Sequence, residues 1–87
     1  MATDVDRLRV GLEEYRGSLA RHLARLSRDY EQVQHSWRAL DQEYEGRAAE
    51  EFRQRWRRTS DWFKDYESAL RTMIAMLETR SQELRGL

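Results

Sequence analysis

The stretch Tyr44-Glu45-Gly46 lies at the midpoint of an 87-residue chain and decides its fold. Gly46 is the only glycine between Gly17 and Gly86, and the chain contains no proline. Glycine adopts the left-handed backbone conformation that ends a helix at the lowest cost. We therefore expect one helix to stop here and a second to begin, so that the chain folds back on itself.

Apolar residues recur every three or four positions on both sides of this stretch, which is the spacing of one face of an α-helix. The sequence therefore predicts an all-α fold, an antiparallel two-helix hairpin that forms a single domain over residues 1–87. The first helix is expected over about residues 4–43, the turn over 44–46 and the second helix over about 47–85. The first apolar row comprises Val5, Leu8, Leu12, Tyr15, Leu19, Leu23, Leu26, Tyr30, Val33, Trp37, Leu40 and Tyr44, and the second Ala49, Phe52, Trp56, Thr59, Phe63, Tyr66, Leu70, Met73, Leu77 and Leu84.

The second helix carries more apolar width than one partner helix covers, because Trp62, Ala69 and Met76 form a flanking row. Small domains are marginally stable without a disulfide or a metal, and this chain has no cysteine. We therefore expect two hairpins to dimerise into a four-helix bundle, with an identical or a related chain as the partner. The residues expected at this interface are Leu19, Leu23, Leu26, Tyr30, Trp37, Trp56, Trp62, Phe63, Leu70, Met73, Met76 and Leu77.

Composition and spacing argue against catalysis and several kinds of ligand. The formal net charge is zero, so we expect no nucleic-acid partner, and the basic run Arg53–Arg58 is interpreted as a solvated helix face. No apolar run approaches the length of a membrane span. His22 and His35 are too far apart for a helical zinc pair. We expect a protein that is not an enzyme and uses no metal or cofactor.

The turn region has a family resemblance. Tyr44, Gly46 and Phe52, with Ala48 and Ala49 between the last two, resemble the WxG family of small early-secreted-antigen-like substrates of type VII secretion. That family carries Trp-x-Gly at the turn of a helical hairpin, and Tyr44 stands here at the tryptophan position. The resemblance implies a turn motif of Tyr44, Gly46 and Phe52 and a protein that acts by binding other proteins.

The resemblance also implies partners and a localisation. The partners would be a second copy or a related small helical protein, together with a secretion ATPase or a larger effector. Tyr66, the last tyrosine, is followed four residues later by Leu70, whereas the family's C-terminal export signal has an acidic residue there. Two interpretations therefore stay open. One is secretion by a non-Sec, type VII-like route, and the other is a cytoplasmic coiled-coil adaptor or scaffold with no export role.

Overall fold

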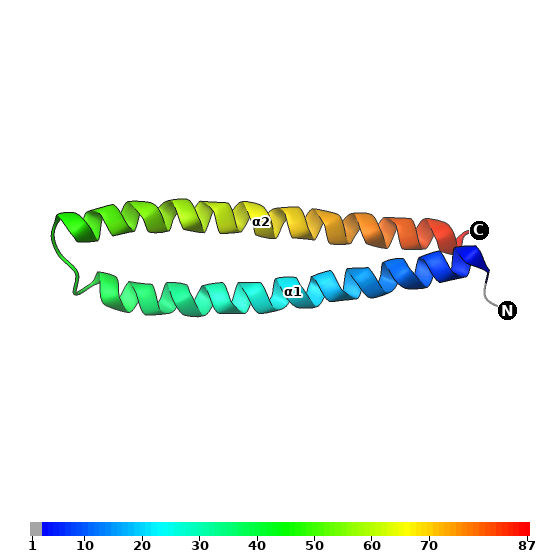
Figure 1. Cartoon of the computed structure of the whole chain (residues 1–87), viewed down its shortest axis with the longest axis horizontal. Helices are drawn as coiled ribbons and strands as arrows, with labels where there is room; N and C mark the ends of the chain where they lie inside the picture. The colour runs from blue at the N-terminus through cyan, green and yellow to red at the C-terminus, as the bar shows by residue number, and fades with distance from the viewer. Residues whose placement is uncertain (1–2) are drawn as a thin grey trace.

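A computed structural model describes residues 3–87 and shows two long antiparallel α-helices joined by one turn (Figure 1). Helix α1 spans Asp4–Asp41 and helix α2 spans Arg47–Arg85. The hairpin measures 67 × 17 × 14 Å. The start of α1 lies beside the end of α2, at the end of the molecule opposite the turn. The predicted all-α hairpin is confirmed for the described residues, and residues 1 and 2 of the expected domain lie outside them.

Local sequence signals account for where the helices begin. The Thr3 hydroxyl accepts a hydrogen bond from the Asp6 backbone N–H, and the Asp6 carboxylate accepts one from the Thr3 N–H, at 3.1 Å each. This reciprocal pair satisfies two backbone N–H groups that the first helical turn leaves without partners. Thr3 is therefore the N-cap of α1.

Gly46 has a different place in the turn from the one expected. The first helix ends at Asp41, and its C-cap Gln42 has ordinary right-handed backbone angles. Gly46 is instead the N-cap of α2, with φ of 103° and ψ of −177°. These angles lie in a region that only glycine occupies readily. The prediction that this glycine ends the first helix is wrong, because it starts the second, and residues 42–46 form the turn.

The two helices meet along one edge of their apolar rows instead of along the centre. In α2, the positions covered by α1 form an apolar row (Ala49, Trp56, Phe63, Leu70, Leu77 and Leu84) and a second, mostly polar row (Arg53, Ser60, Glu67, Ile74 and Ser81). Hydroxyl and carboxylate groups of the polar row reach partners on α1: Ser60 contacts the Tyr30 hydroxyl and Glu67 accepts from Ser27. These partners make the partial burial of polar groups tolerable.

Because the helices meet along one edge, six of the twelve residues of the first apolar row and four of the ten of the second are exposed. Among the residues that the sequence places in the seam, the large exposed ones are Val5, Leu8, Tyr15, Val33, Leu40, Tyr44, Phe52, Tyr66 and Met73. Among the described residues, the buried apolar core consists only of Ala49, Phe63 and Leu70. The hairpin therefore buries much less apolar surface than its sequence offers.

Aromatic side chains fill the turn-proximal half of the seam. The Tyr30 ring stacks on Phe63 with centroids 4.2 Å apart and on Trp56 at 5.9 Å. Trp37 packs against Phe52 with centroids 4.4 Å apart. Offset aromatic pairs of this kind add to the free energy gained by burial alone.

Candidate functional site: an open apolar face

One long side of the hairpin is closed by polar and charged contacts between the helices. Arg16 pairs with Glu78 at 3.5 Å, and Glu13 pairs with Arg85. Ser27 donates to Glu67, and Arg53 pairs with Asp41 nearer the turn. These four contacts run the length of the molecule, and we refer to this side as the ladder side.

The opposite side carries apolar groups where the ladder side carries charges. Its central contact joins His22 of α1 to Tyr66 of α2, with the histidine Nε2 3.3 Å from the tyrosine hydroxyl. Residues seven positions from these two share their faces of the helices, which brings Tyr15 beside Met73. We call the exposed apolar and aromatic residues of this side the open face, and they are Leu8, Tyr15, His22, Val33 and Leu40 of α1 and Phe52, Trp62, Tyr66, Ala69, Met73 and Met76 of α2.

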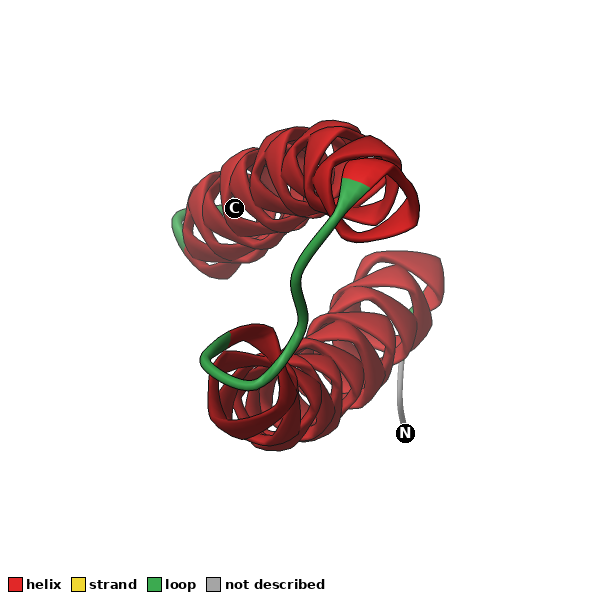
Figure 2. Ribbon diagram, turned by 90° about the vertical axis from the view of Figure 1, so that its left-hand side faces the viewer, coloured by secondary structure: helices red, strands yellow, loops and turns green. Residues whose placement is uncertain are grey.

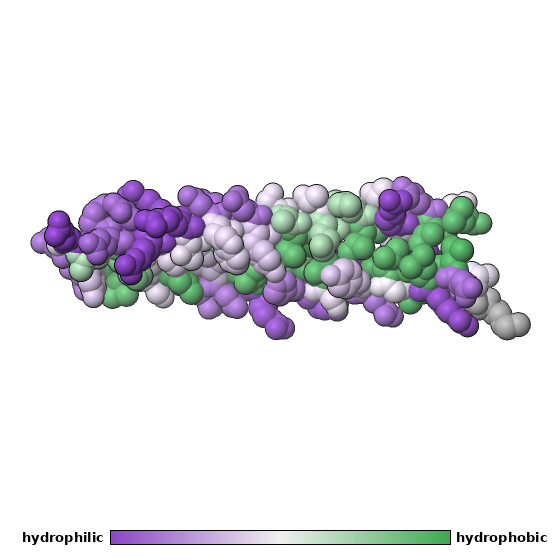
Figure 3. All heavy atoms as spheres, turned by 45° about the horizontal axis from the view of Figure 1, so that its top comes forward, coloured by the Kyte–Doolittle hydropathy of each residue, from purple (hydrophilic) through white to green (hydrophobic). Residues whose placement is uncertain are grey.

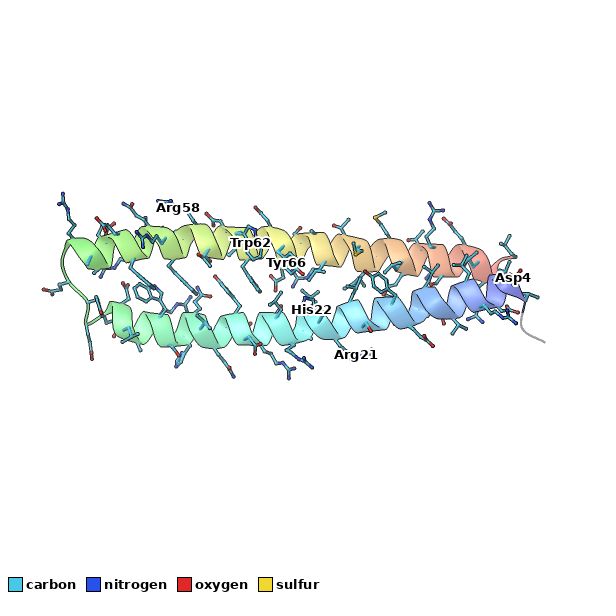
Figure 4. All side chains as sticks on the ribbon, viewed as in Figure 1. Asp4, Arg21, His22, Arg58, Trp62 and Tyr66 are labelled. Carbon is cyan, nitrogen blue, oxygen red and sulfur yellow. The ribbon has the colours of Figure 1, made fainter. Side chains whose placement is uncertain are left out.

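Trp62 is the most prominent side chain of the open face. It is 65% exposed, and its ring stacks on Tyr66 with centroids 5.5 Å apart and nearly parallel planes. Figure 4 shows Trp62, Tyr66 and His22 together on the side that faces the viewer. The indole therefore projects from α2 as an apolar knob beside the Tyr66 ring.

Next to this knob the surface is hollowed. A hollow of about 610 Å³ lies along the same helix, lined by Asp65, Ser68, Ala69, Thr72, Met73, Met76, Leu77 and Arg80. Met76 at its rim is 63% exposed. Figure 3 shows that hydrophobic residues gather over the half of the hairpin that carries the chain ends, whereas the turn half is hydrophilic on this view. Exposed apolar surfaces of this kind are common where proteins bind partners.

The structure divides the twelve residues that the sequence expects at the dimer interface. Phe63 and Leu70 are each only 7% exposed and belong to the hairpin's own seam. Seven others are partly covered by the opposite helix, namely Leu19, Leu23, Leu26, Tyr30, Trp37, Trp56 and Leu77. Trp62, Met73 and Met76 remain exposed. Only these three of the twelve are freely available to a second protein.

The backbone of the turn is held by Arg53, for which the sequence indicates a different role. Arg53, interpreted as part of a solvated basic face, donates to the Tyr44 carbonyl at 2.8 Å and to the Asp41 carbonyl at 3.3 Å. It also pairs with the carboxylates of Asp41 and Glu50. The hydrogen bond that Arg53 donates to the Asp41 carboxylate raises the pKa of the Arg53 guanidinium further above its usual value. The signal in the sequence was an arginine one helical turn after Ala49 and Glu50, close enough to reach back over the turn.

The three predicted turn residues have different surroundings. The Tyr44 side chain is exposed, Gly46 caps α2, and Phe52 packs against Trp37 across the seam. Figure 2 looks along the molecule from the turn end and shows the loop crossing between the two helices, with no other element of the described chain over either side. The turn motif is thus accessible at one tip of the molecule.

Comparisons with known proteins add no relative. No protein-family model matches the chain, and neither the curated proteins nor the solved structures contain a match. Within residues 3–87, no helix is long and apolar enough to cross a membrane. In the same residues, no three histidine or acidic side chains gather as they would around a metal ion. The open face and the turn are therefore the two surface features that bear on function.

Proposed function

We propose that this chain is a non-enzymatic protein-binding hairpin, and that it acts as a WxG-like substrate or secretion partner of a type VII system. It associates through its open face with a second small helical protein, so that two hairpins form a four-helix bundle. The single observation that carries this proposal is that the two helices meet along one edge of their apolar rows. This arrangement leaves Trp62, Tyr66, Met73 and Met76 exposed on one side.

The surface area of the hairpin supports an association of this kind. The chain exposes 7202 Å², whereas a compact monomer of 10.6 kDa exposes only about 5,500 Å². The difference of roughly 1,700 Å² exceeds the ~800 Å² that each partner buries in a standard stable interface. The hairpin, which measures 67 × 17 × 14 Å, therefore exposes more surface than a standard interface requires.

The turn supports the secretion part of the proposal. Tyr44 and Gly46 stand where the WxG family has its tryptophan and glycine, and the Tyr44 ring is exposed at the tip. The Arg53 contacts fix the backbone of the turn without using that ring. A secretion ATPase or a larger effector can therefore bind the turn at the tip while a second hairpin covers the open face.

Export in a bacterium with an active type VII secretion system tests this proposal. The chain should appear in the culture supernatant and should stay in the cells of an isogenic strain that lacks the system's ATPase. Tyr44→Ala should reduce export while leaving the helical content unchanged, since Tyr44 is exposed. His35→Ala, also at an exposed position but away from the turn and the open face, is the matched control and should be exported normally.

Retention of the chain in cells that export a resident substrate would contradict the secretion role. That result would favour the alternative, a coiled-coil adaptor that binds protein partners without being exported.

A further inference from the structure

We propose that the outward face of α1 binds an acidic α-helix of another protein, through a stripe formed by Arg21, Arg25 and Arg28. This arginine stripe shares no residue with the open face or with the turn, so the inference goes beyond the proposed function. The partner is identified by its chemistry, namely a helix that presents carboxylates with the spacing of the three arginines.

The three arginines form one line along α1. They lie four and three residues apart, the spacing that places side chains on the same face of a helix. All three are exposed, and Figure 4 shows Arg21 on the edge of α1 that faces away from α2. At 1.5 Å per residue, the stripe is about 10 Å long.

The positive charge of the stripe is not balanced by its surroundings. Residues 15–28 contain four arginines and no acidic residue. The fourth of these arginines, Arg16, pairs with Glu78 on the ladder side. Arg21 donates to the neutral Ser18 hydroxyl at 3.2 Å, and no acidic residue of the described chain, 3–87, forms an ion pair with the stripe.

This arrangement disfavours the hairpin on its own. Like charges three or four residues apart repel each other along a helix. The nearest acidic residues in the sequence, Asp29 and Glu31, do not pair with the stripe. Gly17 leaves room for Arg21, because a Cβ there would come within 3.3 Å of the Arg21 Nη1 atom. Carboxylates of a bound partner would relieve the repulsion.

Arginine is well suited to this partner. Its planar guanidinium can donate two parallel hydrogen bonds to one carboxylate, which fixes geometry as well as charge. A second helix has the same rise per residue as α1. If it carries glutamates at i, i+4, i+7 and i+11, it sets one carboxylate opposite each arginine in either orientation, because this series contains both orders of the steps of four and three.

The surroundings of the stripe distinguish a protein partner from other anionic partners. No exposed large apolar residue of α1 lies between residues 16 and 32. Bases of single-stranded nucleic acids stack on exposed aromatic rings, and helices that lie on membranes insert apolar side chains. The stripe has neither, so charge complementarity with carboxylates is the interaction that it offers.

A designed peptide gives the first test. The probe is an alanine-rich, end-capped and fluorescently labelled helix with glutamates at i, i+4, i+7 and i+11. Its anisotropy should rise on titration with the chain at low ionic strength, and its dissociation constant should rise with added salt, because exposed charge pairs are screened. A peptide of the same composition with glutamates spread around the helix should bind more weakly. Equal binding of both peptides, or binding of neither, would overturn the proposal.

Replacement of the stripe locates the binding on the molecule. The stripe variant combines Arg21→Gln, Arg25→Gln and Arg28→Gln. It should raise the dissociation constant of the peptide about 10- to 100-fold, since each exposed pair contributes a factor of roughly 2–5. Its circular dichroism should be unchanged and its Tm should not fall, because the three positions are exposed and the repulsion between them is removed.

Three arginines of α2 supply the matched control. The variant with Arg55→Gln, Arg57→Gln and Arg58→Gln loses the same charge from exposed positions and should change the dissociation constant by less than ~2-fold. Equal losses in both variants would show a general effect of charge and would overturn the proposal. Tighter binding of a single-stranded DNA oligonucleotide than of the peptide, lost in the stripe variant, would also overturn it and would assign the stripe to nucleic acid.

Exchange of the charges completes the test. A chain with glutamate at all three stripe positions should lose the acidic peptide and should bind a peptide with lysines in place of the glutamates. Failure of this exchange in a folded variant would contradict direct pairing between the stripe and the partner's carboxylates. These peptide measurements do not depend on secretion, so their failure is distinguishable from a failure of the export experiment.

Discussion

Replacement of Gly46 tests the turn at the position where the fold depends on one residue. The φ of 103° and ψ of −177° place Gly46 in a region that side chains of the natural hand avoid. An added Cβ would meet no atom within 4 Å, so the cost of Gly46→Ala comes from the backbone alone. We expect it to lower the free energy of unfolding by about 1–3 kcal/mol.

A second glycine supplies a control with the opposite sign. Gly11 lies inside α1, and a Cβ there would also meet nothing within 4 Å. Gly11→Ala should therefore raise the free energy of unfolding by about 0.5–1 kcal/mol, since alanine favours the helix. Replacement of Gly46 by D-alanine, which prefers positive φ, should restore the stability that Gly46→Ala removes.

Urea denaturation followed by circular dichroism at one fixed protein concentration measures these changes. Each kcal/mol corresponds to a change in Tm of roughly 4–8 °C for a chain of this size, so thermal melts should agree. If Gly46→Ala stabilised the protein as Gly11→Ala does, residue 46 would be helical. The two-helix hairpin fold would then be contradicted.

Three further changes probe the rest of the structure. Phe63→Ala, which opens the buried stack against Tyr30, should cost about 3–5 kcal/mol of unfolding free energy in urea, and a loss below 1 kcal/mol would show that Phe63 is not in the core. Ser81→Ala should raise the stability by up to about 1 kcal/mol, because the buried Ser81 hydroxyl has no hydrogen-bond partner, whereas a loss would reveal a partner for it. The hydrogen bond from Arg85 lowers the pKa of the Glu13 carboxyl below its ordinary 4.5, so the stability from this pair is present above that pH and is lost as the pH falls through the lowered pKa. Acid titration of Glu13→Gln should lack this component, and an unchanged acid transition would contradict the pairing.

Periodicity and the position of Gly46 together predict the two helices and their antiparallel arrangement. Apolar spacing identified both long helices, and Gly46 identified the region of the turn because the rest of the chain lacks helix-breaking residues between Gly17 and Gly86. The role of Gly46 as an N-cap did not follow, since glycine with positive φ serves at either end of a helix.

Apolar spacing alone does not predict that the helices meet along one edge of their apolar rows. A wide apolar stripe can be covered along its centre or along one edge, and apolar residues alone do not choose between these arrangements. The choice depends on polar pairs such as Tyr30 with Ser60 and Ser27 with Glu67, which lie 30 and 40 residues apart in sequence. Arg53 was misassigned for a similar reason, because its acceptors are backbone carbonyls of the turn that only the folded chain brings within reach.

Size-exclusion chromatography coupled to small-angle X-ray scattering tests the central claim most directly, since it gives mass and length together. We expect a helical species of about twice 10.6 kDa with a maximum dimension close to the 67 Å of one hairpin. A monomeric mass at high concentration would contradict pairing of the open face with a second copy of the chain. A maximum dimension near ~130 Å, the length of one continuous helix at 1.5 Å per residue, would contradict the hairpin itself.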